Sequence, residues 1–289
     1  MKTLIFSILG LFLMTSMNRD MPAYAIYNSK GKATDFEKLV KEAAEVDVVL
    51  FGELHNSPVI HWLELELTRS LHQIKGNRLI LAAEMFESDN ALIINEYLNG
   101  KVKDKNFEAE ARLWPNYKTD YKPLLQFARD SNLIFVPSNI PRRYAAIVNR
   151  EGFEGLDSLS SEAKNLIAPL PVAYDPELPG YKSMIEMMGE NGGEHVNNNL
   201  PKAQAVKDAT MAYNIARNAV NGKIVLHFHG TYHSDNFEGI VWYLKRLKPE
   251  LKILTINSSE QDEVAPLESG TEGIADYIIV VPTSMTKTY

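Results

Sequence analysis

Short apolar runs alternate along the chain with longer stretches in which apolar residues recur at helical spacing. Six such runs lie at residues 47–51, 79–83, 133–136, 224–226, 251–256 and 277–281. The runs are apolar on both faces, which is typical of parallel strands covered by helices on each side. The pattern therefore predicts a mainly parallel sheet.

Amphipathic stretches connect these runs. They predict helices at residues 35–45, 58–71, 90–98, 119–128, 141–150, 201–219 and 237–247. Pro58 and Pro201 open two of them, and proline is tolerated in the first helical turn. Strands that alternate with helices predict an α/β fold, in which a mainly parallel sheet is flanked by helices through right-handed crossovers.

Residues 152–200 interrupt the alternation. This segment is rich in proline and glycine and contains no strong strand pattern. It predicts a small helical lobe or lid, inserted into an α/β domain that residues 26–151 and 201–289 form. Residues 1–25 precede that domain as a leader.

The leader has the pattern of an export signal. Lys2 is followed by an apolar run at residues 4–14, which is too short to span a membrane but fits a secretory signal. Residues 23–25 read Ala-Tyr-Ala, a pattern for signal cleavage. Residues 13–16 resemble the run before the lipidated cysteine of a bacterial lipoprotein, but Met17 stands where that cysteine would be. The sequence predicts an exported protein, and no thiol at residue 17 is available for a lipid anchor.

Composition excludes several kinds of chemistry. The 289 residues carry a formal net charge of -7, which argues against nucleic acid as a partner because phosphate binding needs a basic surface. Cysteine is absent, so the chain forms no disulfide and offers no thiolate as nucleophile or metal ligand.

Polar side chains follow four consecutive predicted strands. They are Glu53 and His55, then Glu84 and Glu87, then Asn139, Arg142 and Arg143, and finally His227, His229 and His233. In open α/β sheets, ligands bind beyond the carboxyl ends of the strands. The sequence therefore predicts a binding or catalytic site at this edge.

Some of these residues also have simple structural interpretations. Glu87 is interpreted as a helix cap or surface charge, and His55 and His61 as caps or solvated helix residues if they lie outside the site. His227 and His229 share a strand face, so at least one of them is expected to be a packed histidine.

Metal chemistry is a further hypothesis for the strand ends. Glutamate and neutral histidine bind Zn²⁺ and similar cations, which makes Glu53, His55, Glu84 and His233 candidate ligands of a divalent metal. The chain lacks the H-E-x-x-H spacing of zinc proteases, a glycine-rich phosphate loop and a G-x-S-x-G nucleophile motif.

An ordered series of residues carries a family resemblance. It consists of Gly52-Glu53-Leu54-His55, Glu84, Asp120-Tyr121, the run Asn139-Ile140-Pro141-Arg142-Arg143-Tyr144, Ala203-Gln204 with Asp208, Met211 and Ala212, and finally Gly230 with His233. From about residue 33 to residue 281 the chain resembles the ChaN-type haem-binding lipoproteins. Their wider superfamily includes Tiki proteases and erythromycin esterases.

The resemblance implies an α/β fold with a small helical lobe and a role in acquiring iron from haem. It also implies anchorage at the bacterial outer membrane, where a haem receptor system would be a partner. It further implies a homodimer that holds haem between its subunits through a tyrosine ligand. Met17 departs from the family pattern and affects the anchor, so the expected compartment is the outer membrane or periplasm.

Tyr144 is the first candidate for the iron ligand. A phenolate is a hard, anionic ligand that suits ferric haem, and Arg142 and Arg143 beside it could pair with the haem propionates. The alternative is that Tyr144 is an amphipathic helix residue with a buried ring.

The inserted lobe offers other haem ligands. Tyr174 and Tyr181 are rival tyrosines, and His195 could bind the iron or a propionate unless it is a solvated loop residue.

Three functions are consistent with these residues. The first is a haem carrier. The second is a metal-dependent hydrolase, in which Glu53, His55, Glu84 and His233 would activate water. The third is a small-molecule binding module unrelated to haem.

Overall fold

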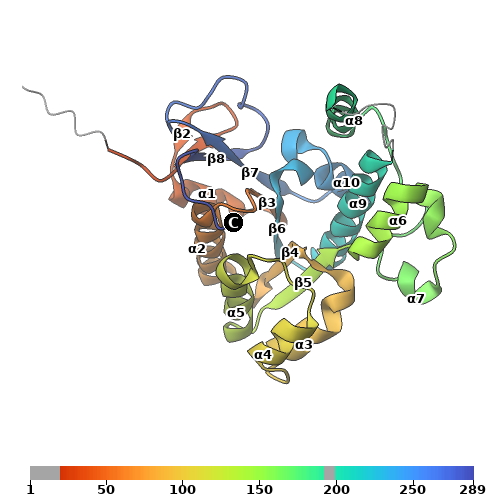
Figure 1. The fold of residues 1–289 in the computed structure, drawn as a ribbon. Coiled ribbons are helices and arrows are strands. Elements are labelled where there is room, and N and C mark those ends of the chain that lie inside the picture. Colours follow the sequence, from red (N-terminus) through yellow and green to blue (C-terminus); the bar gives the residue numbers. More distant parts are fainter. Residues whose placement is uncertain (1–19, 192–198) are drawn as a thin grey trace, which may run out of the picture.

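A computed structural model describes residues 20–191 and 199–289, and they form an α/β fold around an eight-stranded sheet. The strand order is β2-β1-β8-β7-β3-β6-β4-β5. Figure 1 shows helices on both sides of this sheet. The predicted fold class is confirmed.

All six predicted strands are present and run parallel. They are β3 (Val48–Glu53), β4 (Leu79–Glu87), β5 (Ile134–Asn139), β6 (Ile224–Gly230), β7 (Ile253–Gln261) and β8 (Tyr277–Pro282). Two strands that the sequence did not predict, β1 (Ala25–Asn28) and β2 (Ala33–Thr34), extend the sheet antiparallel beyond β8. β3 lies in the middle, between β7 and β6, so its carboxyl end faces the centre of the sheet edge.

One layer of helices covers each face of the sheet. On one face lie α1 (Phe36–Ala43), α2 (Pro58–Lys75), α3 (Ala91–Leu98), α4 (Asp104–Glu110) and α5 (Lys122–Asp130). On the other lie α6 (Arg142–Glu151), α9 (Leu200–Asn218) and α10 (Ile240–Leu247). The two layers stand on opposite sides of the strands in Figure 1.

Two predicted helices begin differently. A π-helical turn at Tyr117–Tyr121 precedes α5, where the sequence predicted a regular helix from residue 119. The helix predicted from residue 237 begins at Ile240, because Gly239 has a φ of +50° and Phe237 one of +60°. Positive φ values do not continue a right-handed helix.

The alternation of side chains along the strands divides the polar groups between the two faces. Phe51 packs in the core on the α2 side, and Glu53, two residues later, points to the same side. Ala82 packs in the core on the α9 side, and Glu84 follows it there. Successive strand residues point to opposite faces, so the sheet edge receives one carboxylate on each side.

The inserted segment packs onto the domain core in its first part. It contains the 3₁₀ turn Phe153–Leu156, α7 (Ser161–Lys164) and α8 (Pro179–Asn191), and its described residues include no strand. Leu156, Ile167 and Val172 belong to the same apolar cluster as α9. The division of the chain into a domain and a separate lobe stays a prediction.

Some predictions fall outside the described ranges. The apolar run of the leader, Met17 and His195 all lie there. Within the described ranges, no helix is long and apolar enough to cross a bilayer.

Candidate functional site

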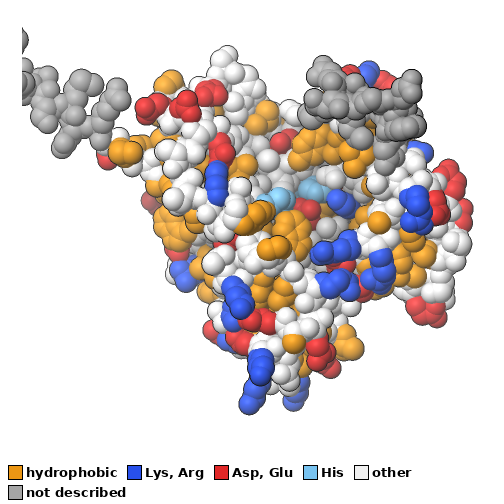
Figure 2. All heavy atoms as spheres, in the orientation of Figure 1, with side chains coloured by type: hydrophobic (Ala, Val, Ile, Leu, Met, Phe, Trp, Pro, Cys, Tyr) orange, Lys and Arg blue, Asp and Glu red, His pale blue; other side chains and the backbone are white. Residues whose placement is uncertain are grey.

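A hollow of about 510 Å³ lies at the carboxyl ends of β3, β4, β5 and β6. Its lining consists of His55, Glu84, Glu87, Leu113, Trp114, Pro115, Asn139, Ile140, Arg142, Lys207 and His233. Figure 2 shows histidine side chains deep in this face and Lys and Arg side chains gathered beside them. The four strand ends that the sequence singled out therefore meet in one place.

Glu53 anchors the polar group on the α2 side. Its Oε1 accepts hydrogen bonds from His55 Nδ1 and from the Tyr121 hydroxyl, each at 2.7 Å. Burial opposes the charge on Glu53, but the His55 hydrogen bond and the His61 charge outweigh it and lower the pKa of Glu53. Burial likewise opposes protonation of His55, and the bond to Glu53 raises the pKa of His55 above its usual value.

His61 lies inside this group. Its Nδ1 is 3.7 Å from Glu53 Oε2 and 3.3 Å from Glu64 Oε2, while its Nε2 is 3.4 Å from Asp120 Oδ2. The interpretation of His61 as a cap or solvated residue is wrong, because only 5% of the residue is exposed. Burial opposes its protonation, but the surrounding carboxylates raise the pKa of His61 to about 10.

Glu64 was missed at the sequence level. It lies one helical turn after His61 on α2 and is fully buried. Burial and the nearby Glu53 charge raise the pKa of Glu64 well above its usual value. The available signal was the i, i+3 spacing of His61 and Glu64 on a helix that begins just after Glu53.

A second polar group lies on the α9 side. Glu84 Oε2 accepts a hydrogen bond from the Gly230 amide at 2.8 Å, and Glu84 Oε1 is 3.2 Å from His233 Nε2. His233 Nδ1 contacts Asp208, whose other oxygen accepts the Tyr181 hydroxyl at 2.8 Å. His233 therefore lies between two buried carboxylates.

The ionisable side chains of this second group shift one another's pKa values. Burial opposes protonation of His233, but Glu84 and Asp208 outweigh it and raise the pKa of His233 to about 10. Burial also opposes the charge on Glu84, yet His233 holds the pKa of Glu84 well below its usual range. Burial raises the pKa of Asp208 despite the imidazole beside it.

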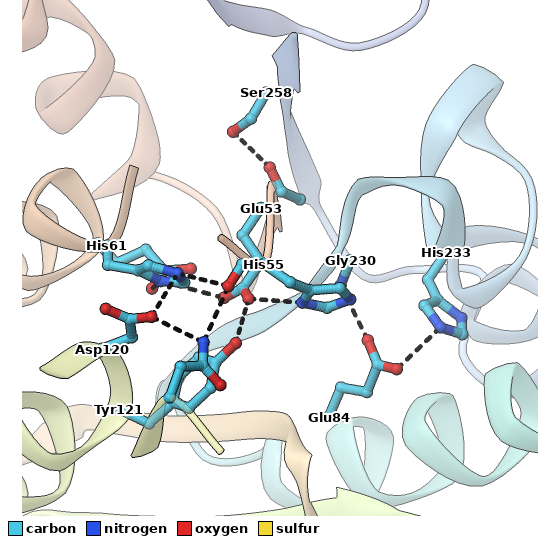
Figure 3. Close-up of polar contacts among 12 residues, drawn as sticks. Glu53, His55, His61, Glu84, Asp120, Tyr121, Gly230, His233 and Ser258 are labelled. Atoms are coloured by element: carbon cyan, nitrogen blue, oxygen red, sulfur yellow. Dashed lines mark hydrogen bonds and ion pairs between the residues drawn. The ribbon is translucent and has the colours of Figure 1, made fainter. Parts of the chain in front are cut away.

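His55 lies between the two groups, as Figure 3 shows. Its side chain is 32% exposed and lines the hollow, with Glu53 on one side and Gly230 on the other. A Cβ on residue 230 would lie 2.6 Å from His55 Nε2, so only glycine leaves room for this imidazole. The four predicted metal ligands are thus divided, with Glu53 and His55 in one group and Glu84 and His233 in the other.

His227 and His229 are both fully buried. His227 contacts the Ser138 hydroxyl at 2.8 Å and His229 at 3.1 Å, and His229 contacts the Ser234 hydroxyl at 2.9 Å. Burial lowers the pKa of both, that of His229 to about 3. These histidines are neutral, packed and hydrogen-bonded, as expected for at least one of them.

Glu87 is buried, so its interpretation as a surface charge is wrong, but it does stand at the N-cap position of the 3₁₀ turn Ser88–Asn90. It accepts hydrogen bonds from the Arg142 amide at 3.1 Å and from Arg112 at 3.0 Å, and it also pairs with the Arg142 guanidinium. Asp89 pairs with both Arg112 and Arg143. These five residues form a mixed-charge cluster at the rim of the hollow, called here the arginine cluster.

The three candidate tyrosines lie in different environments. Tyr144 is half-buried, its hydroxyl is 3.3 Å from Arg143 Nη2, and the Arg143 guanidinium lies 4.4 Å above its ring. Tyr181 is buried and donates to Asp208, and Tyr174 packs beside it with ring centroids 5.7 Å apart. None of the three is among the described residues that line the hollow.

Comparison with protein families identifies the chain. Residues 39–244 match the family described as haem-binding uptake, Tiki superfamily, ChaN. The chain belongs to this family. The ChaN resemblance seen in the sequence is therefore confirmed, and this membership favours haem binding over the hydrolase hypothesis. No curated protein matches the chain.

Two solved structures are similar to the chain, and the first of them agrees with it at the level of the fold. ChaN of Campylobacter jejuni, solved with cofacially bound haem, is 16% identical and has a TM-score of 0.63, over 89% of this chain and 96% of that chain. A mutant erythromycin esterase in its open conformation is 13% identical with a TM-score of 0.46, over 90% of this chain and 83% of that one.

Proposed function

We propose that this protein binds ferric haem on the face that carries the hollow, as a carrier in bacterial haem-iron uptake. Membership in the ChaN family supports haem as the ligand. The single structural observation that carries the proposal is the combination, on this one face, of an apolar wall, surplus positive charge and a tyrosine beside a guanidinium.

The apolar wall suits the haem ring. Haem is a flat apolar disc, and binding sites for such ligands are mostly apolar with a few placed polar groups. Leu113, Trp114, Pro115 and Ile140 supply apolar surface in the hollow. A volume of about 510 Å³ is within the usual range of ligand pockets.

The charge at the rim suits the propionates. In the arginine cluster, three guanidinium groups face two carboxylates, which leaves one positive charge in excess. Lys207 lines the hollow and adds a second positive charge. Two surplus positive charges match the two propionates of one haem, and arginine pairs well with carboxylates.

Tyr144 is the tyrosine best placed to act as the iron ligand. Its hydroxyl lies beside Arg143. This cation would stabilise the anionic phenolate form in which a tyrosine binds ferric iron. Tyr181 would first have to give up its hydrogen bond to buried Asp208, and burial raises its pKa further from the anionic form. This difference favours Tyr144 over Tyr181.

A homodimer would complete the haem site. The hollow is open to solvent in Figure 2, so a disc lying against it would keep one face uncovered. A second copy of the chain would cover that face, and the Campylobacter jejuni relative binds haem cofacially.

We further propose that the protein acts outside the cytoplasm, at the outer membrane or in the periplasm, where a haem receptor system would deliver or accept its cargo.

The substitution Tyr144→Phe tests the ligand. We expect it to weaken ferric haem binding and to remove the charge-transfer absorption of tyrosine-bound ferric haem, while the fold stays intact. Tyr213→Phe is the matched control, because Arg217 lies 5.3 Å above the Tyr213 ring in a similar pair, and both residues line a different hollow. An unchanged spectrum and affinity in Tyr144→Phe would show that Tyr144 does not bind the iron.

A further inference from the structure

We infer that Glu53, His61 and Glu64 form a buried site for one divalent transition-metal ion, directly behind the floor of the hollow. This site is separate from the haem proposal and uses two residues, His61 and Glu64, that the strand-end metal hypothesis does not include. Glu53 reaches it from the end of β3, and the other two residues from the first turns of α2.

The spacing of the three ligand atoms fits a metal ion. They lie within 4.8 Å of one another, and His61 Nδ1 is 3.3 Å from Glu64 Oε2 and 3.7 Å from Glu53 Oε2. Ligand atoms bound tetrahedrally at about 2.0–2.1 Å stand roughly 3.3–3.4 Å apart. An ion could therefore bind all three with small adjustments of their side chains.

The carboxylates have unused oxygen atoms inside the protein. Glu53 uses Oε1 for His55 and Tyr121, whereas its Oε2 and Glu64 Oε1 are buried without a hydrogen-bond partner. The exposed fraction is 1% for Glu53 and zero for Glu64, so bulk water does not solvate these atoms. Buried polar oxygens without partners are costly, and a bound cation would supply the missing partner.

The surroundings of His61 are those of a metal-binding histidine. While Nδ1 faces the two glutamates, Nε2 lies 3.1 Å from the His55 carbonyl and 3.4 Å from Asp120 Oδ2. Asp120 is held in turn by the Asn116 amide at 2.7 Å. Histidine ligands commonly donate their second nitrogen to a carboxylate or carbonyl, which fixes the ring and the tautomer.

The ligand types indicate the class of ion. An imidazole nitrogen favours Zn²⁺, Fe²⁺ and similar ions over Mg²⁺ or Ca²⁺, while two carboxylates also suit Mn²⁺. Binding of the ion would release the protons held by His61 and Glu64. The two carboxylates and the neutral imidazole then carry two negative charges, which one divalent ion neutralises. The competing arrangement is a proton shared between Glu53 and Glu64 with no metal present.

An ion at this position would act on the fold and on the floor of the hollow. The burial of both glutamates leaves no route for a substrate-sized ligand. The ion would connect α2 to β3, and it would fix Glu53, which orients His55 through its hydrogen bond.

The test uses the full chain and Zn²⁺ as the probe. We expect the purified protein, after treatment with a chelator, reloading and desalting, to retain about one equivalent of zinc by elemental analysis and to unfold at a higher temperature when loaded. Glu64→Gln preserves the side-chain shape and should lose the stoichiometric zinc. Asp120→Asn should lower the affinity for zinc about 10–100-fold, as is usual for partners of a metal-binding histidine.

Glu84→Gln is the control, because Glu84 is equally buried at a strand end but belongs to the His233 group. It should retain zinc like the unmodified protein. Failure of the unmodified protein to retain zinc would overturn the inference in favour of the shared proton. Zinc lost in Glu84→Gln and kept in Glu64→Gln would overturn it too, because the ion would then lie at the His233 group. Neither outcome decides the haem proposal, which is tested separately by titration with hemin.

Discussion

At the scale of single residues, His233 carries much of the pH dependence that we expect. Its pKa is about 10 in the folded protein, because the charges of Glu84 and Asp208 outweigh burial, against about 6.5 for an ordinary histidine. A raised pKa stabilises the folded state fully below about pH 6.5, and this contribution is lost as the pH rises toward 10.

We therefore predict that the free energy of unfolding falls by more than about 1 kcal/mol between pH 6.5 and pH 10. Urea titrations across this range measure it. The pKa of His61 is raised in the same direction, so His61 adds to this loss of stability. His233→Gln should therefore remove only part of the dependence on pH. The same slope in His233→Gln and in the unmodified protein would contradict this role of His233.

Residue types at the strand ends were predictable, but their partners were not. The positions of Glu53, Glu84 and His233 follow from the ends of apolar runs. Burial of Glu87 depends on arginines brought from elsewhere in the chain, including Arg112, whose position next to Glu87 no local pattern indicates. Only a packed fold turns an apparent surface charge into a buried ion pair.

At the scale of elements, long apolar runs predicted the parallel strands because those strands are buried on both faces. β1 and β2 were missed because four and two residues are too short for a periodic signal. The π-helical turn at Tyr117–Tyr121 was also missed, although it supplies Asp120 and Tyr121 to the Glu53 group. Such turns are rare and have no sequence period of their own.

The beginning of α8 is held to the α9 side by a few polar contacts. The Gly180 amide donates to Glu238 at 2.7 Å, and Tyr181 donates to Asp208 at 2.8 Å. We predict that Tyr181→Phe lowers the free energy of unfolding by about 1–3 kcal/mol, because a buried carboxylate loses a partner. Faster amide hydrogen exchange in α8 should accompany this loss.

Tyr174→Phe is the control for that substitution. Tyr174 packs against Tyr181, and no hydrogen bond of its hydroxyl is found among the described residues. Its effect on stability should be smaller than about 0.5 kcal/mol. Equal effects of the two substitutions would show that the Asp208 bond does not hold α8.

At the scale of the whole molecule, the family and the fold could be predicted from the ordered motifs of the sequence. Whether a dimer forms could not be predicted from them. The surface that would meet a second copy is an open face whose charges are partly paired within the chain. Sequence and monomer structure define what one copy offers to haem. Whether a second copy covers the other face of the haem ring has to be measured.

Sedimentation velocity with and without one equivalent of hemin, followed at both protein and haem absorbance, tests the central claim most directly. We predict that haem absorbance sediments with the protein and that hemin shifts the protein from monomer to dimer. Haem that sediments with a monomer would contradict the shared site alone. Haem absorbance that does not sediment with the protein would contradict the proposed function.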